Sequence, residues 1–284
     1  MAERVTETLY DAYAQQFSVD EKLLEQKSQH QHLLIFENAK FGRVLTLDGV
    51  VQTTEGDEFV YHEMLTHVPI LAHGEVRRVL IIGGGDGGIL REVVRHAAVT
   101  AITQVEIDAA VVEMSKAYLP RHSAGAFDDP RLNLVIDDGF VFVCNSTEQF
   151  DVIIVDSTDP IGPGEVLFTQ DFYAACKARL APGGVLVTQN GVPFMQLDEV
   201  RDTAARFARV FADWHFYSAA VPTYVGGIMT FGWASDAPAL RRVAVATLEA
   251  RYRAAGLSTR YYTPELHPAS FALPGFVLDA IGKR

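Results

Sequence analysis

From about Val76 onward, short runs rich in Val, Ile and Leu alternate with segments whose apolar residues have helical spacing. The strand-like runs are VRRVLIIG, ITQVEID, LNLVIDDG, DVIIVDSTD and VLVTQN, and the helical patterns are ILREVVRH, AAVVEMSKAYL and QDFYAACKARL. We expect the last helix to stop at Pro182-Gly183-Gly184. Strands this apolar are covered on both faces, and the alternation is typical of parallel sheets. The pattern predicts a mostly parallel, doubly wound α/β sheet, whose ligands bind beyond the carboxyl ends of the strands.

The first third of the chain has a different pattern, in which short strands are joined by turns. HLLIFEN, VLTLDG and VVQTTE read as strands, and Asp48-Gly49 between apolar residues is a strong hairpin signal. A helical stretch, FVYHEMLTHVPIL, then leads into the α/β region. We therefore expect a β-strand domain over residues 1–66 and a Rossmann-like catalytic domain over residues 67–284.

Composition excludes several classes of protein. No apolar run approaches the roughly 20 residues of a membrane span, and the first residues lack the order of a secretory signal. Cys144 and Cys176 alone provide neither a disulfide framework nor a metal cluster, so we expect a cytoplasmic protein. The net charge of −12 disfavours nucleic acid and acidic membranes as partners. It suits cationic substrates, although solubility alone is the commoner reason for such a charge.

A glycine-rich loop, Gly83 to Gly88, lies between the first predicted strand of the sheet and the helix after it. It satisfies the G-x-G-x-x-G pattern, which by itself admits a dinucleotide, a nucleoside or a simple tight turn. Asp86 within the loop favours the nucleoside, because its carboxylate would repel the pyrophosphate of a dinucleotide. A cationic centre, such as the sulfonium of an adenosylmethionine-like ligand, would be attracted instead.

Acidic residues also end the next two strands. Glu106 comes about 20 residues after Asp86, where nucleotide sites often hold an acid that binds the ribose hydroxyls. Asp138 can accept a hydrogen bond from an adenine amino group, and Gly139 lets the base lie close. The alternatives are a solvated acid at Glu106 and an ordinary turn at Asp138-Gly139.

The stretch DVIIVDSTDPIGPGE places two further acids, Asp156 and Asp159, after a buried strand. The two carboxylates can converge only if the chain turns after Asp156, since residues three apart in a strand point to opposite faces. We expect Gly162-Pro163-Gly164 to form a loop without regular structure. A capping aspartate and a turn aspartate are the alternative.

These acids suit the alkylation of an amine. An alkyl ammonium has a pKa near 10 and must lose a proton before it attacks carbon. One carboxylate can accept that proton, while others hold the distal ammonium and fix the line of attack. The leaving group from a sulfonium is a neutral thioether, so we expect neither a general acid nor a metal.

At these residues the sequence closely resembles bacterial spermidine synthases, the polyamine aminopropyltransferases. The matching pieces are long and in order along almost the whole chain, among them LDGVVQTTEGDEFVYHEMLTHVP, VLIIGGGDGGILREV, DSTDPIGPGE, PTYVGGIMTF and YYTPELHPASFALP. The resemblance implies a small N-terminal β-sheet domain, a Rossmann-like domain of the methyltransferase type, and a homodimer or homotetramer. It implies aminopropyl transfer from decarboxylated S-adenosylmethionine, a co-substrate, to putrescine, with spermidine and methylthioadenosine as products and no cofactor.

The resemblance also implies a role for each matching site residue. On the nucleoside side it implies roles for Gln31, Gln52, Glu106, Asp138, Gly139 and Pro163. On the polyamine and aminopropyl side it implies roles for Tyr61, His62, Asp86, Asp156, Asp159 and Tyr224, with Asp156 as the catalytic base. By themselves the aromatic residues would more often belong to a core or an interface.

Other functions stay open at this point. An amine N-methyltransferase on the same scaffold would use intact S-adenosylmethionine, whose carboxylate Asp86 would repel. A non-catalytic polyamine or nucleoside sensor would not need a base, and an NAD-dependent dehydrogenase is disfavoured by Asp86. Gln189-Asn190-Gly191 departs from family members that carry an acid after the glutamine, so the sequence leaves the preferred length of the diamine open.

Overall fold

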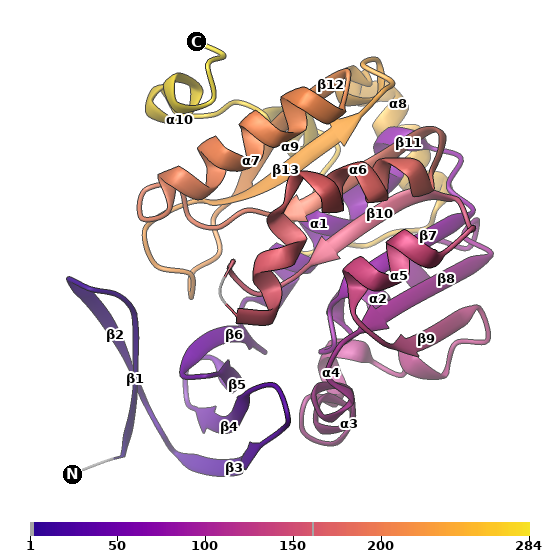
Figure 1. Ribbon diagram of the computed structural model, residues 1–284. Helices are drawn as coiled ribbons and strands as arrows, with labels where there is room; N and C mark the ends of the chain where they lie inside the picture. The colour runs from indigo at the N-terminus through magenta and orange to yellow at the C-terminus, as the bar shows by residue number, and fades with distance from the viewer. Residues whose placement is uncertain (1–2, 161) are drawn as a thin grey trace.

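The computed structural model describes residues 3–160 and 162–284 and contains three β-sheets with helices around the largest (Figure 1). The strands are β1 Arg4–Tyr10, β2 Tyr13–Ser18, β3 Glu21–Lys27, β4 His32–Asn38, β5 Gly42–Leu47, β6 Val50–Thr54, β7 Arg78–Gly83, β8 Ala101–Glu106, β9 Leu132–Ile136, β10 Phe150–Asp156, β11 Leu180–Gln189, β12 Asp213–Ala219 and β13 Met229–Ser235. The α-helices are α1 Glu58–His73, α2 Gly88–Val94, α3 Ala109–Tyr118, α4 Pro120–Ser123, α5 Gly139–Asn145, α6 Gln170–Arg179, α7 Leu197–Val210, α8 Val245–Ala254, α9 Leu266–Ser270 and α10 Gly275–Ala280, and the 3₁₀ helices are η1 Ala126–Asp128, η2 Gly162–Phe168 and η3 Leu240–Arg242.

The largest sheet has the strand order β12-β13-β11-β10-β7-β8-β9. Strand β13 is antiparallel to both of its neighbours, and the remaining pairs are parallel, which confirms the predicted mostly parallel sheet. From β7 the chain first builds outward through β8 and β9, and then returns to place β10 on the other side of β7. The strand order thus reverses between β7 and β10, and the crevice at their carboxyl ends is called the switch point. Sheets of this type bind ligands there.

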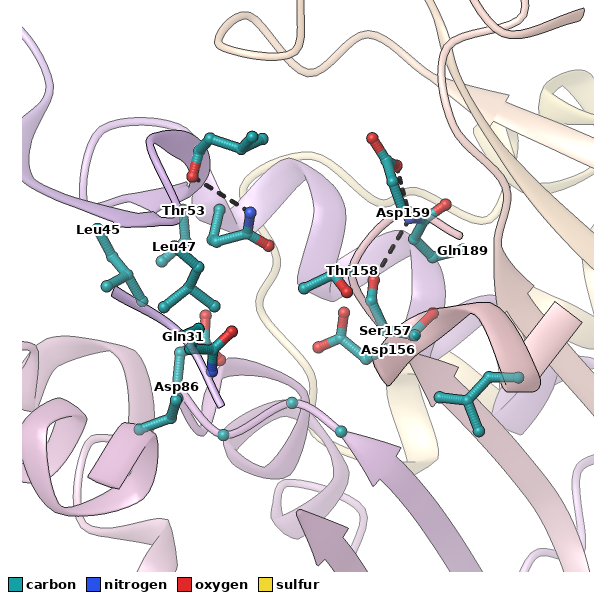
Figure 2. Close-up of a pocket in the computed structure, with 18 of the residues that line it drawn as sticks. Gln31, Leu45, Leu47, Thr53, Asp86, Asp156, Ser157, Thr158, Asp159 and Gln189 are labelled. Atoms are coloured by element: carbon teal, nitrogen blue, oxygen red, sulfur yellow. Dashed lines mark hydrogen bonds between the residues drawn. The ribbon is translucent and has the colours of Figure 1, made fainter. Parts of the chain in front are cut away.

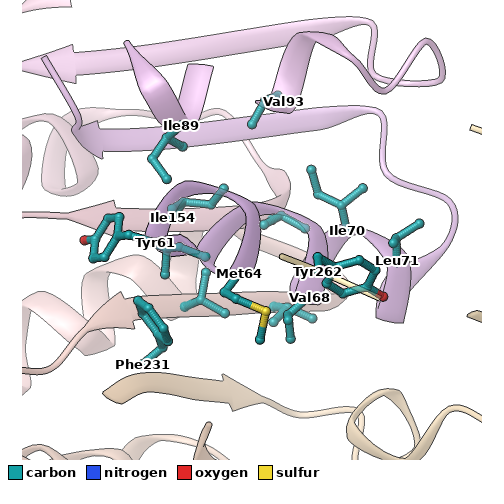
Figure 3. Packing of buried hydrophobic residues seen from close by; sticks show 14 of the residues in the cluster. Tyr61, Met64, Val68, Ile70, Leu71, Ile89, Val93, Ile154, Phe231 and Tyr262 are labelled. Carbon is teal, nitrogen blue, oxygen red and sulfur yellow. The ribbon is translucent and has the colours of Figure 1, made fainter. Parts of the chain in front are cut away.

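The alternation of apolar residues along β7 explains why helices cover both faces. Val79 and Ile81 belong to a core with residues of α1, α2 and α8, and Figure 3 shows α1 and α2 side chains in that core. Leu80 and Ile82 belong to a second core with residues of α5, α6 and α7. Because successive side chains of a strand point to opposite faces, a continuous apolar run fills both cores.

The four-stranded sheet β3-β4-β5-β6 is antiparallel throughout. In β4, Leu33 and Ile35 pack in a core with residues of α3, whereas Leu34 and Phe36 share a core with Phe17. This sheet lies beyond the end of the large sheet toward which β10 points (Figure 1). It is therefore placed to cover the carboxyl ends of the parallel strands.

Asp48 and Gly49 form the two-residue turn between β5 and β6, where Leu47 pairs with Val50. Both turn residues have positive φ, 49° and 82°, as a type I′ hairpin requires. The hairpin prediction is confirmed. The predicted helix after it is α1, and the predicted domain boundary between residues 66 and 67 falls inside this helix and stays a prediction.

Two local expectations are wrong. Residues 162–164 begin the 3₁₀ helix η2 instead of an irregular loop, because the tight i to i+3 turns of a 3₁₀ helix accommodate a glycine-rich segment. Helix α6 ends at Arg179, and β11 begins at Leu180, before the Pro-Gly-Gly sequence that was expected to stop the helix. Leu180 pairs with Phe150, and regular pairing resumes only at Val185 with Val152, so Pro-Gly-Gly lies in a bulge of the strand.

Candidate active site

A pocket of about 290 Å³ lies between the carboxyl ends of the parallel strands and the N-terminal sheet. Figure 2 shows Gln31 and Leu47 of the N-terminal sheet region on one side of it and the segment from Asp156 to Asp159 on the other. The pocket is lined by every predicted site residue with a described side chain: Gln31, Gln52, Tyr61, His62, Asp86, Glu106, Asp138, Gly139, Asp156, Asp159 and Tyr224. The side chain of Pro163 lies outside what the structure describes.

Asp156 is the last residue of β10 and pairs with Gly83 of β7, so it lies at the switch point. Gly83 has a φ of +83°, and a Cβ there would collide with the backbone carbonyl oxygen of Asp156. The hydroxyl of Tyr61 donates a 2.6 Å hydrogen bond to Oδ1 of Asp156, and Oδ2 faces Gly84. Burial and the nearby charge of Asp86 raise the pKa of Asp156 to about 6.

Asp86 lies in the glycine loop next to the buried ring of His62. Its Oδ1 accepts a 2.8 Å hydrogen bond from the backbone N–H of Gly88, and its Oδ2 lies 3.3 Å from Nε2 of His62. Burial acts to raise the pKa of Asp86, but the positive charge of His62 outweighs it and holds that pKa below the usual range. Asp86 is therefore ionised and faces the same space as Asp156.

The predicted ribose acid, Glu106, ends β8 and is only 7% exposed. Its Oε1 accepts a 2.9 Å hydrogen bond from the backbone N–H of Asp108. Burial raises the pKa of Glu106 to about 7. Gln31 reaches the same region from the N-terminal domain, where its Nε2 donates a 3.2 Å hydrogen bond to Asp108. A diol that donates two hydrogen bonds to Glu106 would replace the water that this carboxylate loses on burial.

Asp138 and Gly139 lie where β9 passes into α5. Oδ1 of Asp138 caps the helix by accepting from the backbone N–H groups of Phe140, at 2.7 Å, and Val141, at 3.1 Å. The alternative interpretation of Asp138-Gly139 was an ordinary turn, whereas the structure shows Asp138 as a helix cap in the wall of the pocket. A Cβ on Gly139 would collide with Ile82, so the absence of a side chain also allows α5 to approach the sheet.

The far end of the pocket contains Asp159 and two glutamines. Nε2 of Gln189 donates to Oδ1 of Asp159 at 3.2 Å, and Nε2 of Gln196 donates to Oδ2 at 3.0 Å (Figure 2 shows the first of these). Burial raises the pKa of Asp159. Tyr224 donates a hydrogen bond to the backbone carbonyl of Gln52 and thereby joins the two domains across the pocket.

His62, Asp86 and Asp156 offer nitrogen and oxygen atoms within 4.8 Å of one another, a spacing that a cation can occupy. Both ring nitrogens of His62 already face carboxylate oxygens, at 2.5 Å from Glu58 and 3.3 Å from Asp86. The ring therefore has no free lone pair for a metal, and the arrangement suits an organic ammonium better. The expectation that no metal takes part stays a prediction.

Sequence reasoning missed several polar residues around the pocket. Glu58 and Arg91 lie behind His62, Gln196 holds Asp159, and Glu7 of the N-terminal hairpin lines the pocket. Glu58 precedes His62 by four residues on one predicted helix, so helical spacing alone would have paired them. The other three depend on contacts between distant segments and have no comparable local signal.

Two family descriptions match the chain in order along the sequence. The spermidine synthase tetramerisation domain matches residues 4–55, and the spermine/spermidine synthase domain matches residues 58–243. The chain belongs to the spermine/spermidine synthase family. Members of this family are aminopropyltransferases, and the predicted class of enzyme, a transferase, is confirmed.

No helix within residues 3–160 or 162–284 combines the length and apolar character that a bilayer crossing needs.

Curated members of the family are similar over nearly their whole length. Polyamine aminopropyltransferase 1 of Pseudomonas aeruginosa is 66% identical over 278 residues, which cover 98% of this chain and 97% of that protein. The polyamine aminopropyltransferase of Pseudomonas syringae pv. tomato is 62% identical over 277 residues, with the same coverage of 98% and 97%.

Solved spermidine synthases have the same fold. One, in complex with the transition state analogue AdoDATO, superposes with a TM-score of 0.93 at 38% identity and covers 99% of this chain and 96% of its own. The spermidine synthase of Thermotoga maritima superposes with a TM-score of 0.90 at 36% identity and covers 99% and 95%. The predicted fold, a small N-terminal β-sheet domain on a Rossmann-like domain, is confirmed.

Proposed function

We propose that this chain transfers the aminopropyl group of decarboxylated S-adenosylmethionine to putrescine and releases spermidine and methylthioadenosine. The observation that carries the proposal is the placement of Asp86 and Asp156 on either side of the switch point, in a pocket that the N-terminal sheet covers. The donor contributes a sulfonium and an ammonium, and the acceptor is a diammonium. Buried carboxylates stabilise such charges, because the pocket offers them little water.

In the proposed reaction, Asp156 accepts a proton from the attacking ammonium of putrescine. The freed amine forms a bond to the methylene carbon next to the sulfonium, and the carbon–sulfur bond breaks with its electron pair passing to sulfur. The products are a secondary ammonium and a neutral thioether, so charge and protons balance when Asp156 later releases its proton to solvent. Tyr61 fixes the orientation of Asp156 through Oδ1 and leaves Oδ2 to take the proton.

The remaining predicted site residues are given binding roles. We assign the ribose to Glu106, the adenine edge to Asp138 and Gly139, and the thioadenosine part to Gln31 and Gln52, together with Pro163. The ammonium of the aminopropyl group is assigned to the carboxylate of Asp86, and His62 lines this end of the pocket beside that carboxylate. We assign the acceptor to Asp159 and Tyr224, where Gln189 and Gln196 hold the Asp159 carboxylate against the pocket.

A matrix of two donors and several amines tests this function. Purified protein is incubated with decarboxylated or intact S-adenosylmethionine and with putrescine, cadaverine or spermidine, and the products are read by mass spectrometry. The proposal expects product only with the decarboxylated donor. With putrescine the products should be spermidine and methylthioadenosine, and putrescine should be among the best acceptors. S-adenosylhomocysteine from the intact donor would instead identify an amine methyltransferase, and tight polyamine binding without product would identify a sensor.

We also propose that the chain forms a homodimer or homotetramer and works in the cytoplasm. The match of residues 4–55 to a tetramerisation domain supports self-association. Sedimentation velocity across a hundredfold range of concentration tests it and distinguishes the two assemblies. A monomer at every concentration would contradict the proposal.

A further inference from the structure

The ring of His62 is held between two carboxylates. Its Nδ1 lies 2.5 Å from Oε2 of Glu58, and its Nε2 lies 3.3 Å from Oδ2 of Asp86. The ring is only 2% exposed, so water does not compete for either nitrogen. Asp86 belongs to the pocket, whereas Glu58 stands behind the ring and does not line the pocket.

This geometry fixes the number of protons on His62. A neutral imidazole carries one N–H and one lone pair, and a carboxylate oxygen can only accept. Two favourable contacts with carboxylates therefore require a proton on both nitrogens, which makes the ring a cation. Burial acts to lower the pKa of His62, but Asp86 and Glu58 outweigh it and raise that pKa to about 10.

Arg91 keeps Glu58 ionised and in place. Its Nη2 lies 2.8 Å from Oε2 of Glu58 and its Nη1 3.2 Å from Oε1, so the guanidinium contacts both carboxylate oxygens. Nη1 also donates to the backbone carbonyl of His122 at 2.8 Å, which anchors the arginine. Burial acts to raise the pKa of Glu58, but the charges of His62 and Arg91 lower it overall. Helix α1 brings Glu58 to His62 because residues four apart share one face.

The other groups around His62 do not offset this charge. The ring of His122 from α4 stands 6.1 Å away, centroid to centroid, and burial lowers the pKa of His122, so this second ring is neutral. The ring of Tyr61 packs edge-on at 5.5 Å. Asp156 offers an oxygen within 4.8 Å of a ring nitrogen of His62, so the cation acts on both pocket carboxylates.

We propose that Glu58 is a positioning residue, which holds His62 as a cation against Asp86 and thereby keeps Asp156 ionised at neutral pH. The inference deepens the proposed function, because it rests on Asp156 as the base. Two carboxylates that share a small pocket repel each other, and one of them takes up a proton unless a cation compensates. His62 supplies that cation at the wall of the pocket, and Glu58 keeps it protonated from behind the ring, outside the pocket.

The substitution Glu58→Gln tests the inference, because it keeps the size of the side chain and removes its charge. In wild type, protonation of Asp156 lowers kcat/KM at low pH, and we call this part of the pH profile the acid limb. In Glu58→Gln we expect the acid limb to move to higher pH by about one unit. The variant then loses about fivefold in kcat/KM near pH 6 and about tenfold near pH 5, and it approaches the wild type above pH 8, because well below both pKa values a shift of one unit changes the ionised fraction about tenfold. A merely structural role would give the same loss at every pH.

Glu92→Gln is the matched control. Glu92 also contacts Arg91, at 2.8 Å, and a buried histidine, His67, at 3.0 Å, but it does not line the pocket or contact His62. Its removal should lower the melting temperature and leave the acid limb unchanged. A limb that stays in place in Glu58→Gln, or that moves equally in both variants, would overturn the inference.

NMR of the wild type keeps the inference testable if Glu58→Gln fails to fold. In protein labelled with ¹⁵N-histidine, we expect His62 to show two protonated ring nitrogens up to at least pH 8. A neutral His62 ring at pH 7 would overturn the inference. An active wild type with an unshifted variant contradicts only the role of Glu58, whereas a wild type without transferase activity contradicts the proposed function itself.

Discussion

The hydroxyl of Tyr61 donates a 2.6 Å hydrogen bond to Oδ1 of Asp156, although the two residues are 95 positions apart in the chain. Tyr61 lies on the first helix and Asp156 at the end of β10, so the bond forms only once that helix has packed on the sheet. A hydrogen bond to a carboxylate favours its ionised form. The contact therefore orients the proposed base and opposes the effect of its burial.

Removal of this donor should weaken the base. In Tyr61→Phe, we expect kcat/KM at pH 7 to fall about 10- to 100-fold, the range that corresponds to about 1.5–3 kcal/mol for a hydrogen bond to a charged group. The fall should be smaller at pH 9, where Asp156 is ionised without help. Steady-state kinetics at both pH values check this. An equal loss at both would show that the ring, and not the hydroxyl, is what matters.

The wild-type pH profile follows from the state of Asp156. Burial and the charge of Asp86 raise the pKa of Asp156 to about 6. The base must be ionised, so kcat/KM should decline as the pH falls below about 6 and should be independent of this group well above it. Kinetics between pH 5 and 8 with a constant ionic strength measure the limb. A rate that does not change between pH 7 and 5 would disagree with this assignment.

Asp159 should act on acceptor binding more than on the chemical step. In Asp159→Asn, we expect KM for putrescine to rise about tenfold, while kcat falls by less, because the residue holds an ammonium and does not take its proton. Asp198→Asn is a suitable control, since its side chain is 86% exposed on the first turn of α7. A large fall in kcat with an unchanged KM would assign Asp159 to the chemistry instead.

The sequence predicted the acids of the site for a general reason. Glu106, Asp138 and Asp156 each follow an apolar strand, and parallel strands end at one edge of a sheet, so their side chains meet there. The position of Asp86 could be predicted for the same reason, because the glycine loop that contains it directly follows the strand β7. The roles of Gln31 and Tyr224, by contrast, came only from the resemblance to known enzymes, because no local pattern connects them to the pocket.

Other features were beyond local reasoning. The hairpin of β1 and β2 was not predicted, since RVTETLY and YAQQFS are too polar to stand out as strands. Gln15 attaches this hairpin to the carbonyl of Thr223 at 3.0 Å, a contact across 208 residues. Gln196 reaches Asp159 through a similar long-range contact. Such contacts depend on the packing of whole elements, which the spacing of residues along the chain does not encode.

A buried carboxylate outside the pocket should matter for stability. Glu63 of α1 accepts hydrogen bonds from the backbone N–H groups of Arg260, Tyr261 and Tyr262 at 2.7–2.8 Å. In Glu63→Ala these N–H groups lose their partner, so we expect the free energy of unfolding to fall by about 3 kcal/mol. Urea denaturation at a fixed protein concentration checks this. Glu249→Ala, on the solvent side of α8, should change it by less than about 0.5 kcal/mol.

The most direct test of the account is the turnover of Asp156→Asn, which keeps the shape of the side chain and removes its ability to accept a proton. With decarboxylated S-adenosylmethionine and putrescine, we expect kcat to fall at least about 100-fold, the usual contribution of a general base, while donor affinity measured by calorimetry stays within about threefold of the wild type. Spermidine formation at a rate close to that of the wild type would contradict the account.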